Sequence, residues 1–236
     1  MMDKFFLPGT DKQLKLLLSH FDVNGKDVLV IGAGCESIAK IIKDNNANTV
    51  VIIVEDNDSL LTSRLLLANV KSISVRMMEF DNTDFASQKF DLVYAQASIS
   101  NSKRNKILRE IKRILKPDGF LCVGESVSLK KSIPQFVKDI WKFSGIVPLG
   151  VDEAEKFYRE NNFKVFNEFD LSSTLKEFYQ SGKEFLKGGT ELLTDKEKSY
   201  YKKVLNQISH ESNVYLKLGG YEYIGFRMFL LKKGKE

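Results

Sequence analysis

Cysteine and histidine are both scarce in this chain of 236 residues, which has two of each. Cys35 and Cys122 lie in strand-like stretches, and two such residues suit a reducing, cytoplasmic location better than a disulfide framework. His20 and His210 are far apart in the sequence, and no cysteine cluster accompanies them. The sequence therefore offers no metal site.

Long hydrophobic runs are absent as well. The longest, such as residues 50–54, are far too short to cross a bilayer. The opening stretch, MMDKFFLPGTDK, contains no apolar core of the length that a secretion signal needs. We therefore expect no membrane span and a location in the cytoplasm.

The chain also lacks a strong excess of charge, because 36 basic residues against 31 acidic ones leave a formal charge of +5. The densest basic stretch, residues 103–116, carries Ile107, Ile111 and Leu115 at intervals of four residues. This spacing predicts an amphipathic helix whose basic residues form its solvated face. No basic tail or aromatic-basic module accompanies the stretch, so we expect no nucleic-acid partner.

Apolar strands and amphipathic helices alternate over roughly the first half of the chain. Strands are expected at 27–31, 48–55, 73–79, 90–97 and 120–126, and helices at 10–24, 35–44, 59–68 and 102–116. Thr10 with Gln13 is typical of a capping box, and Pro117 to Gly119 predicts a turn before the fifth strand. The alternation predicts a doubly wound α/β fold with a mainly parallel sheet, whose ligand edge is formed by the loops that follow the strands.

The last third of the chain breaks this rhythm. Helices are expected at 133–146 and 152–161, and strands at 163–171 and 221–233. Between these strands, residues 174–214 contain two helix-like stretches rich in Phe, Tyr and Lys. We interpret 174–214 as a helical cap inserted over the ligand edge of a single domain that spans residues 1–236, because the final strand returns to the sheet.

A glycine turn follows the first strand in the stretch VLVIGAGCES. Gly32, Ala33 and Gly34 allow a ligand to approach the backbone closely, whereas Glu36 stands where a third glycine is expected. Glu55 ends the second strand, 23 residues after Gly32, where a carboxylate can accept hydrogen bonds from both ribose hydroxyls of an adenosine.

The motifs in this order resemble those of class I S-adenosylmethionine-dependent methyltransferases, with a C-terminal cap as in the small-molecule branch. The segments that carry the resemblance are VLVIGAG, Glu55, MEFDNTDF, KFDLVYAQ, ILREIKRILKPDGFLCV and the closing YEYIGFRMFLLKK. The resemblance implies a Rossmann-like, seven-stranded sheet with an antiparallel last strand. It also implies S-adenosyl-L-methionine as cofactor and a small molecule as methyl acceptor.

The resemblance also assigns roles to residues of the ligand edge. Gly32, Ala33 and Gly34 would lie against the methionine portion, Glu55 would hold the ribose, Asp81 and Asn82 would face the adenine, and Ala95 would line the wall near the sulfonium. Two positions depart from the family, since Val30 stands where many members have an acid and Glu36 replaces glycine. A positive φ at position 36 would cost about 1–3 kcal/mol with a glutamate there. Alternatively, Glu36 would contact the amine of the cofactor.

The acceptor side is less well defined. Its candidates are Tyr94, Gln96 and Ser98 after the fourth strand, Glu125 and Ser126 after the fifth, and Trp141, Tyr158, Tyr179 and His210 in the cap. Of these, Tyr94, Gln96 and His210 are the candidates for catalysis. Neither an Asn/Asp-Pro-Pro-aromatic turn nor a Pro-Cys pair is present, which argues against the methylation of nucleic-acid bases.

Two alternatives stay open. The first is an NAD-dependent oxidoreductase, since a glycine turn and Glu55 also suit a dinucleotide, although Ser37 stands where that pattern wants glycine. The second is a catalytically silent pseudo-methyltransferase that serves as a binding partner. Val30 and Glu36, the two departures from the family pattern, are the observations that favour it.

Overall fold

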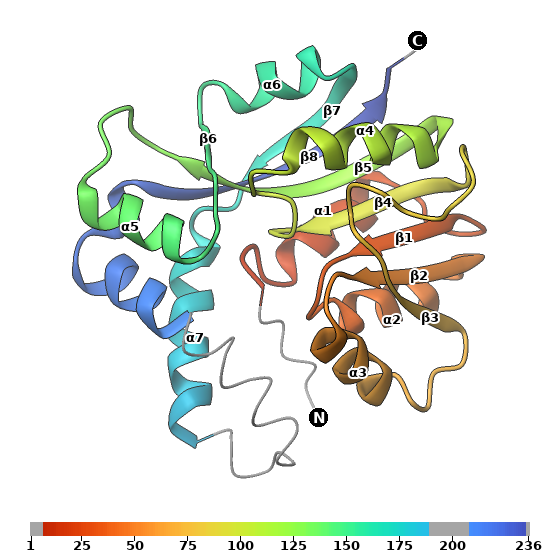
Figure 1. Ribbon diagram of the computed structural model, residues 1–236, viewed down its shortest axis with the longest axis horizontal. Coiled ribbons are helices and arrows are strands. Elements are labelled where there is room, and N and C mark those ends of the chain that lie inside the picture. Colours follow the sequence, from red (N-terminus) through yellow and green to blue (C-terminus); the bar gives the residue numbers. More distant parts are fainter. Residues whose placement is uncertain (1–6, 189–207, 235–236) are drawn as a thin grey trace.

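One mixed sheet organises the part of the chain that the computed structural model describes, residues 7–188 and 208–234 (Figure 1). Its strands are β1 (Asp27–Ile31), β2 (Thr49–Val54), β3 (Ile73–Met77), β4 (Phe90–Gln96), β5 (Leu115–Ser128), β6 (Leu149–Gly150), β7 (Phe163–Asp170) and β8 (Ile224–Lys233). The order is β3-β2-β1-β4-β5-β8-β7, and β6 pairs with the end of β5. Strands β1 to β5 pair with one another in parallel, whereas β8 is antiparallel to both β5 and β7. The predicted fold is confirmed, with the short β6 in addition to the seven expected strands.

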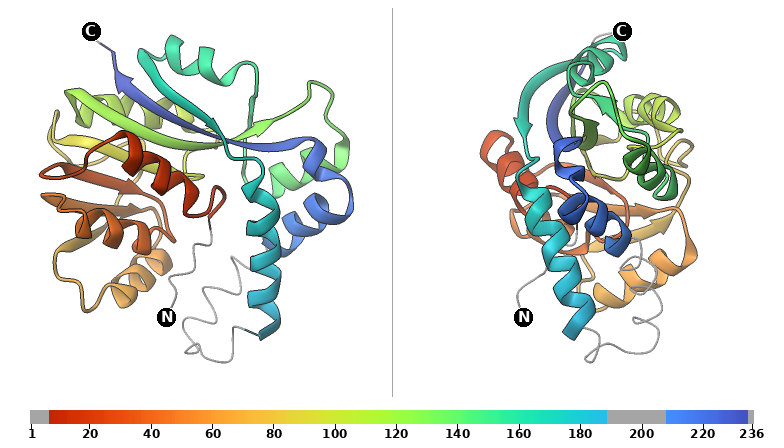
Figure 2. Two further views of the ribbon diagram at one scale, coloured as in Figure 1. Left: turned by 180° about the vertical axis from the view of Figure 1, so that it is seen from behind. Right: turned by 90° about the vertical axis from the view of Figure 1, so that its left-hand side faces the viewer.

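Helices cover both faces of this sheet. They are α1 (Lys12–His20), α2 (Glu36–Asp44), α3 (Asn57–Leu66), α4 (Arg104–Ile114), α5 (Gln135–Phe143), α6 (Ala154–Glu160), α7 (Thr174–Gly188), a 3-10 turn (Gly220–Glu222) and a helix over residues 208–217. Helix α4 lies in front of the sheet in Figure 1, and α1 comes to the front when the molecule is viewed from behind (Figure 2). Because both faces are covered, β1 and β2 are apolar along nearly their whole length.

Alternate side chains of β1 enter two separate cores. Val28 and Val30 are fully buried and pack with residues of α1 and α2, whereas Leu29 and Ile31 pack with residues of α4 and α6. Val30 therefore points into the core beneath α1 and α2, where an apolar side chain fits the packing.

The start of α1 differs from the prediction. Thr10 has a φ of +49°, and Asp11, which precedes the helix, makes no capping hydrogen bond with its side chain. Gln13 is fully buried instead, and its Nε2 donates to the carbonyl oxygen of Ala95 at 3.2 Å. The predicted capping box is wrong because the Gln13 side chain is used to join α1 to β4.

The turn expected before the fifth strand forms an irregularity inside β5. Phe90 of β4 pairs with Leu115, and Leu92 pairs with Phe120, so β5 has three more residues than β4 between these pairs. Pro117 to Gly119 fall in this extra length.

Helices α5, α7 and 208–217 lie together beyond the ends of β1 and β4 (Figures 1 and 2). The first and last parts of the expected cap are thus placed, while its residues 189–207 lie outside the described part of the chain. The assignment of 174–214 as a cap on a single domain stays a prediction. In the described residues, none of the helices has the length and apolar character that crossing a membrane requires.

Candidate functional site

The turn after β1 is built from backbone alone. Gly32 and Gly34 have φ angles of +116° and +78°, which L-residues rarely adopt. A Cβ atom at Gly32 would lie 2.8 Å from the Cβ of Ser98, and one at Gly34 would lie 3.7 Å from a methyl carbon of Leu7. Gly32 is buried beneath Ser98, whereas Ala33 is half-buried and Gly34 is exposed, so the outer part of the turn fits a ligand that lies against the main chain.

Glu36 occupies the first position of α2, where its backbone is helical. Its side chain is 6% exposed, and Oε1 accepts a hydrogen bond from the hydroxyl of Ser63 in α3 at 2.5 Å. Residue 36 has no positive φ, so the backbone strain that a positive φ would bring to a glutamate is absent. The carboxylate instead holds α2 against α3.

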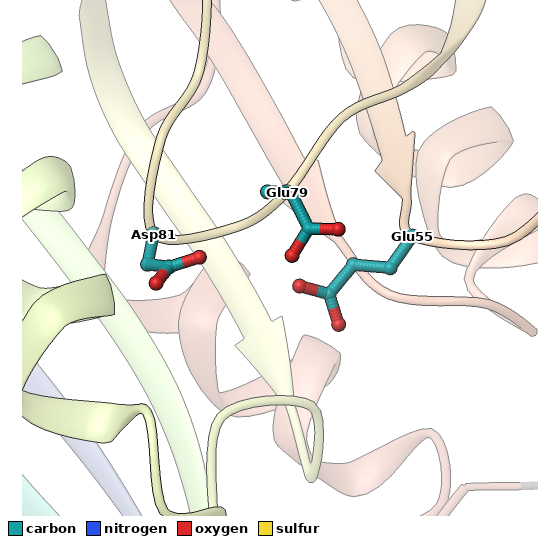
Figure 3. Close-up of side chains that lie close together, drawn as sticks. All are labelled: Glu55, Glu79 and Asp81. Carbon is teal, nitrogen blue, oxygen red and sulfur yellow. The ribbon is translucent and has the colours of Figure 1, made fainter.

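Three carboxylates meet at the ends of β2 and β3 (Figure 3). Glu55, Glu79 and Asp81 each offer an oxygen within 4.8 Å of the others. Glu55 Oε1 accepts from the backbone N–H of Phe80 at 3.1 Å, which joins the two loops. The prediction that Glu55 and Asp81 lie close together is therefore supported by the geometry, and Glu79 is a neighbour that sequence reasoning missed.

Lys103 supplies positive charge to this acidic group. Its Nζ lies 2.6 Å from Glu79 Oε2 and 3.5 Å from Asp81 Oδ1. The hydrogen bond with Glu79, followed by the charges of Asp81 and Glu55, raises the pKa of Lys103. The ammonium group thus already contacts two of the three acids, so we propose no metal ion there.

Hydrogen bonds from Thr83 to Glu110 hold the loop after β3 against α4. Glu110 Oε1 accepts from the backbone N–H and the hydroxyl of Thr83, at 2.9 and 2.5 Å. Arg113 donates to both oxygens of Glu110. Burial alone would raise the pKa of Glu110, but the bonds from Arg113 and Thr83 outweigh it and lower that pKa. Asp81 and the exposed Asn82 are thereby held on an ordered loop.

The chain passes over the glycine turn directly after β4. Ala95 is fully buried, and Ala97 has a φ of +57°. This left-handed residue redirects the backbone so that Ser98 lies against Gly32. Within the described part of the chain, the Ser98 hydroxyl is buried and has no hydrogen-bond partner. A polar atom of this kind beside a backbone turn is consistent with a ligand at this place.

Tyr94 and Gln96 come together but have structural contacts. The Tyr94 hydroxyl donates to Gln96 Oε1 at 2.5 Å, and Gln96 Nε2 donates to the carbonyl oxygens of Pro8 and Thr10 at 2.7 and 2.9 Å. Complete burial raises the pKa of Tyr94 well above its usual value. These bonds fix residues 8–10 beside the end of β4, and neither side chain lines the cavity beneath the cap helices.

A cavity of about 40 Å³ begins at Ala97 and extends under the cap helices. Its lining comprises Pro8, Ala97, Ser126, Ile140, Trp141, Ser144, Ile146, Leu175, Tyr179, Glu211, Ile224 and Gly225. Glu211, from helix 208–217, accepts hydrogen bonds from the hydroxyls of Ser144 and Tyr179, at 2.5 and 3.1 Å. Burial, and then the charge of Glu211, raises the pKa of Tyr179 well above its usual value.

The remaining acceptor-side candidates divide between the two faces of the sheet. Ser126, Trp141 and Tyr179 line the cavity. Glu125 and Tyr158 do not, because adjacent residues of a strand face opposite sides and α6 packs on the face opposite the cap. His210 is exposed and packs against Phe143 with ring centres 5.5 Å apart.

Glu125 belongs to a buried cluster instead. Arg104 Nε lies 3.0 Å from Glu125 Oε1, and the Tyr158 hydroxyl donates to the same oxygen at 2.5 Å. Arg104 was expected on the solvated face of its helix, but it is 5% exposed. That expectation was wrong because the guanidinium is needed to pair with a carboxylate inside the protein.

Several residues of the site were missed by sequence reasoning. Glu79 stands in the quoted segment MEFDNTDF and could have been found as a third acid near the edge. Lys103, Ala97 and Glu211 had no comparable signal, because their roles depend on tertiary contacts between distant elements.

The strand order, the antiparallel β8 between β5 and β7, and the backbone turn beside Glu55 define a class of protein: the Rossmann-like fold of class I methyltransferases. Comparison with known proteins agrees with this assignment of the fold. Residues 29–123 match a family described as the methyltransferase domain, which confirms the predicted resemblance to class I S-adenosylmethionine-dependent methyltransferases.

A curated relative and several solved structures are similar to the chain. The uncharacterized methyltransferase YodH of Bacillus subtilis is 29% identical over 125 residues, which are 46% of this chain and 53% of that protein. The chain therefore matches about half the length of this relative.

Solved structures match nearly the whole chain at low identity. Phosphoethanolamine N-methyltransferase 2 of Haemonchus contortus has a TM-score of 0.76 and 14% identity, over 95% of this chain and 53% of that one. The [4+2]-cyclase SpnF has a TM-score of 0.74 and 17% identity, over 96% and 81%. Geranyl diphosphate C-methyltransferase of Streptomyces coelicolor A3(2) has a TM-score of 0.68 and 12% identity, over 94% and 77%. These similarities establish the fold.

Proposed function

We propose that the chain binds S-adenosylmethionine at the carboxyl edge of its sheet and transfers the methyl group to a small molecule in the cavity beneath the cap. The observation that carries this proposal is the position of the Ala97 loop. On one side the loop lies over Gly32, and on the other it lines the cavity. A donor on the glycine turn and an acceptor in the cavity would therefore meet at this loop.

The residues of the edge fit the parts of the proposed cofactor. Gly32, Ala33 and Gly34 would lie along the methionine portion, Glu55 would accept from the ribose hydroxyls, Asp81 and Asn82 would face the adenine, and Ala95 would form the wall near the sulfonium. When bound, S-adenosylmethionine supplies a methyl group on a good leaving group. The protein then needs chiefly to orient the acceptor and exclude water, which a cavity beneath the cap helices suits.

The similar structures support a small-molecule acceptor. That of Haemonchus contortus was determined with phosphomonomethylethanolamine and S-adenosylhomocysteine, and that of Streptomyces coelicolor with geranyl diphosphate and S-adenosylhomocysteine. We also keep the predictions of a cytoplasmic location and no nucleic-acid partner. The two cysteines are buried and free, as a reducing location requires.

The two alternatives to a methyltransferase, a nicotinamide enzyme and a binding protein without catalysis, are distinguished from it by different observations. The family match and the antiparallel β8 favour a methyltransferase over a nicotinamide enzyme. A binding protein without catalysis would share the fold, and the similarity to a cyclase shows that this fold is not confined to methyl transfer.

Ligand-dependent unfolding tests the proposal. We expect S-adenosylhomocysteine to raise the melting temperature, since a ligand at 100 times its Kd stabilises the folded state by about 2.7 kcal/mol, whereas NAD should not. Asp81→Ala should reduce the shift, and Asp84→Ala, which removes an exposed acid of the same loop, should not. No shift at millimolar ligand would overturn the proposed cofactor. Binding without methyl transfer to amines, phenols, carboxylates or thiols would favour the pseudo-methyltransferase.

A further inference from the structure

The hydroxyl of Ser98 is a buried polar group beside the glycine turn. Its oxygen has no hydrogen-bond partner among the described residues, although Ser98 as a whole is only half-buried. This oxygen would lie 3.4 Å from a Cβ atom at Gly32, so it faces the turn that follows β1. Buried polar groups are nearly always hydrogen-bonded, and an exception requires an explanation. Ser98 was expected on the acceptor side, but it does not line the cavity beneath the cap.

The backbone of the preceding residue holds Ser98 in this place. Ala97 has a φ of +57°, which is uncommon for alanine, and its N–H donates to the carbonyl oxygen of Gly124 in β5 at 3.0 Å. Uncommon backbone conformations of this kind cluster at ligand sites. Because the main chain holds the loop here, the Ser98 hydroxyl is not needed to hold it and is left for another use.

Other polar side chains of the same loop are already engaged. The Ser100 hydroxyl donates to Glu125 on the face of the sheet opposite the cap. Lys103 pairs with Glu79 near the end of β3, where the adenosine portion of the cofactor is expected. Ser98 is therefore the residue by which this loop offers a hydrogen-bond donor to the glycine turn.

The order of the strands decides which part of the cofactor Ser98 would meet. Asp81 follows β3, Glu55 follows β2, Gly32 follows β1 and Ser98 follows β4, and these strands are neighbours in this order. A cofactor with its ribose at Glu55 would extend across the end of β1, so its methionine portion would reach Ser98. We propose that the Ser98 hydroxyl donates a hydrogen bond to the carboxylate of this methionine portion. The inference rests on the proposed methyltransferase function and adds a binding residue to its cofactor site.

The carboxylate is the group that a hydroxyl donor suits. A carboxylate only accepts hydrogen bonds, whereas the ammonium group beside it only donates them and can be met by backbone carbonyl oxygens. A hydrogen bond to an ionised acceptor is also stronger than one between neutral groups. Since Ser98 is half-buried, rotation about its Cα–Cβ bond between staggered positions turns the hydroxyl from Gly32 toward the ligand.

Calorimetric titration with three ligands tests this contact. S-adenosylhomocysteine carries both the carboxylate and the amine, decarboxylated S-adenosylhomocysteine keeps the amine, and methylthioadenosine has neither group. Loss of a hydrogen bond to a charged group should weaken the binding of S-adenosylhomocysteine to Ser98→Ala about tenfold or more. The affinities of Ser98→Ala for the other two ligands should differ from those of the wild type by less than about twofold, because neither ligand has the carboxylate.

The stability of the ligand-free protein separates a binding role from a structural one. The melting temperature of Ser98→Ala should equal or exceed that of the wild type, because a buried polar group without a partner lowers stability. Ser102→Ala, which alters an exposed serine of the same loop, is the control and should change neither the melting temperature nor the three affinities. Ser98→Thr keeps a hydroxyl and should retain more of the affinity for S-adenosylhomocysteine than Ser98→Ala does.

The outcomes for the contact and for the proposed cofactor are separable. Equal losses of affinity for all three ligands in Ser98→Ala, unchanged affinity for S-adenosylhomocysteine, or a melting temperature below that of the wild type would overturn the role of Ser98. The proposed cofactor stands in these cases, because the wild type still binds S-adenosylhomocysteine. Failure of the wild type to bind any of the three ligands would overturn the proposed cofactor, and the contact with it.

Discussion

A Cβ atom added at Gly32 would lie 2.8 Å from the Cβ of Ser98, the residue that crosses the glycine turn after β4. Gly32→Ala also places a side chain at a φ of +116°, so we expect the free energy of unfolding to fall by about 1–3 kcal/mol and the binding of S-adenosylhomocysteine to weaken. Urea unfolding and calorimetric titration measure the two effects. Gly25→Ala is the control, because Gly25 has a φ of +69° with no atom within 4 Å of the added Cβ. Equal effects of the two variants on binding would contradict this role for Gly32.

Glu55 should contribute to cofactor affinity through its charge. A hydrogen bond to a charged group contributes about 1.5–3 kcal/mol, so Glu55→Ala should weaken S-adenosylhomocysteine binding about tenfold or more. Glu55→Gln should have a smaller effect, because an amide oxygen can still accept from Phe80 and from a hydroxyl. Asp58→Asn, an exposed acid at the start of α3, is the control in the same titration. Unchanged affinity in Glu55→Ala would remove this residue from the proposed site.

The ligand edge was predictable because its signals are local. Apolar runs such as β1 and β2 mark buried parallel strands, and the residues that follow them must share one edge whatever the details of packing. Glu55 and Asp81 were therefore placed together from sequence alone. The closing strand was recognised in the same way, by its long apolar stretch.

The acceptor cavity could not be predicted because its residues meet only through tertiary packing. Glu211 gains its place from the contact of helix 208–217 with α5 and α7, which no short-range pattern encodes. Ala97 has a left-handed backbone that is not expected of alanine. Charged side chains are rarely buried, so the burial of Arg104 and of Glu125 was not expected from either residue alone. Their burial is explained by the ion pair that they form with each other.

The buried pair of Arg104 and Glu125 should make a large contribution to stability when one partner is removed. Arg104→Met leaves the fully buried Glu125 carboxylate without its counter-charge, for which a loss of about 3–5 kcal/mol is expected in urea unfolding. Arg109→Met, on the exposed side of the same helix, should change stability by less than about 0.5 kcal/mol. Adding Glu125→Leu to Arg104→Met should recover part of the loss. Similar values for the two arginine variants would show that the pair is not needed for stability.

Glu110 should make stability depend on pH in the acid range. Its pKa in the folded protein lies below the ordinary value of 4.5, so its contribution is present above that value and is lost as the pH falls through the folded pKa. Glu110→Gln should therefore be less stable than the wild type at pH 7, with a smaller difference at pH 3. Urea unfolding at both pH values measures this. Glu160→Gln, which alters an exposed acid paired with Lys156, is the control. An equal difference in stability between Glu110→Gln and the wild type at the two pH values would count against the proposed linkage.

Variants of Glu36 and Ser63 distinguish a role of the Glu36 carboxylate in cofactor binding from its role in stability. If its carboxylate meets the amine of S-adenosylmethionine, Glu36→Gln should weaken binding several-fold, because the amide can still accept from Ser63 but has lost the charge. Ser63→Ala keeps the charge and removes the hydrogen bond, so it should lower the free energy of unfolding by about 1 kcal/mol and affect binding less. Calorimetric titration of S-adenosylmethionine and urea unfolding of both variants provide the comparison. Unchanged binding in Glu36→Gln would show that this residue joins α2 to α3 and does not contact the cofactor. The glutamate at the position where a third glycine is expected would then contribute to helix packing alone.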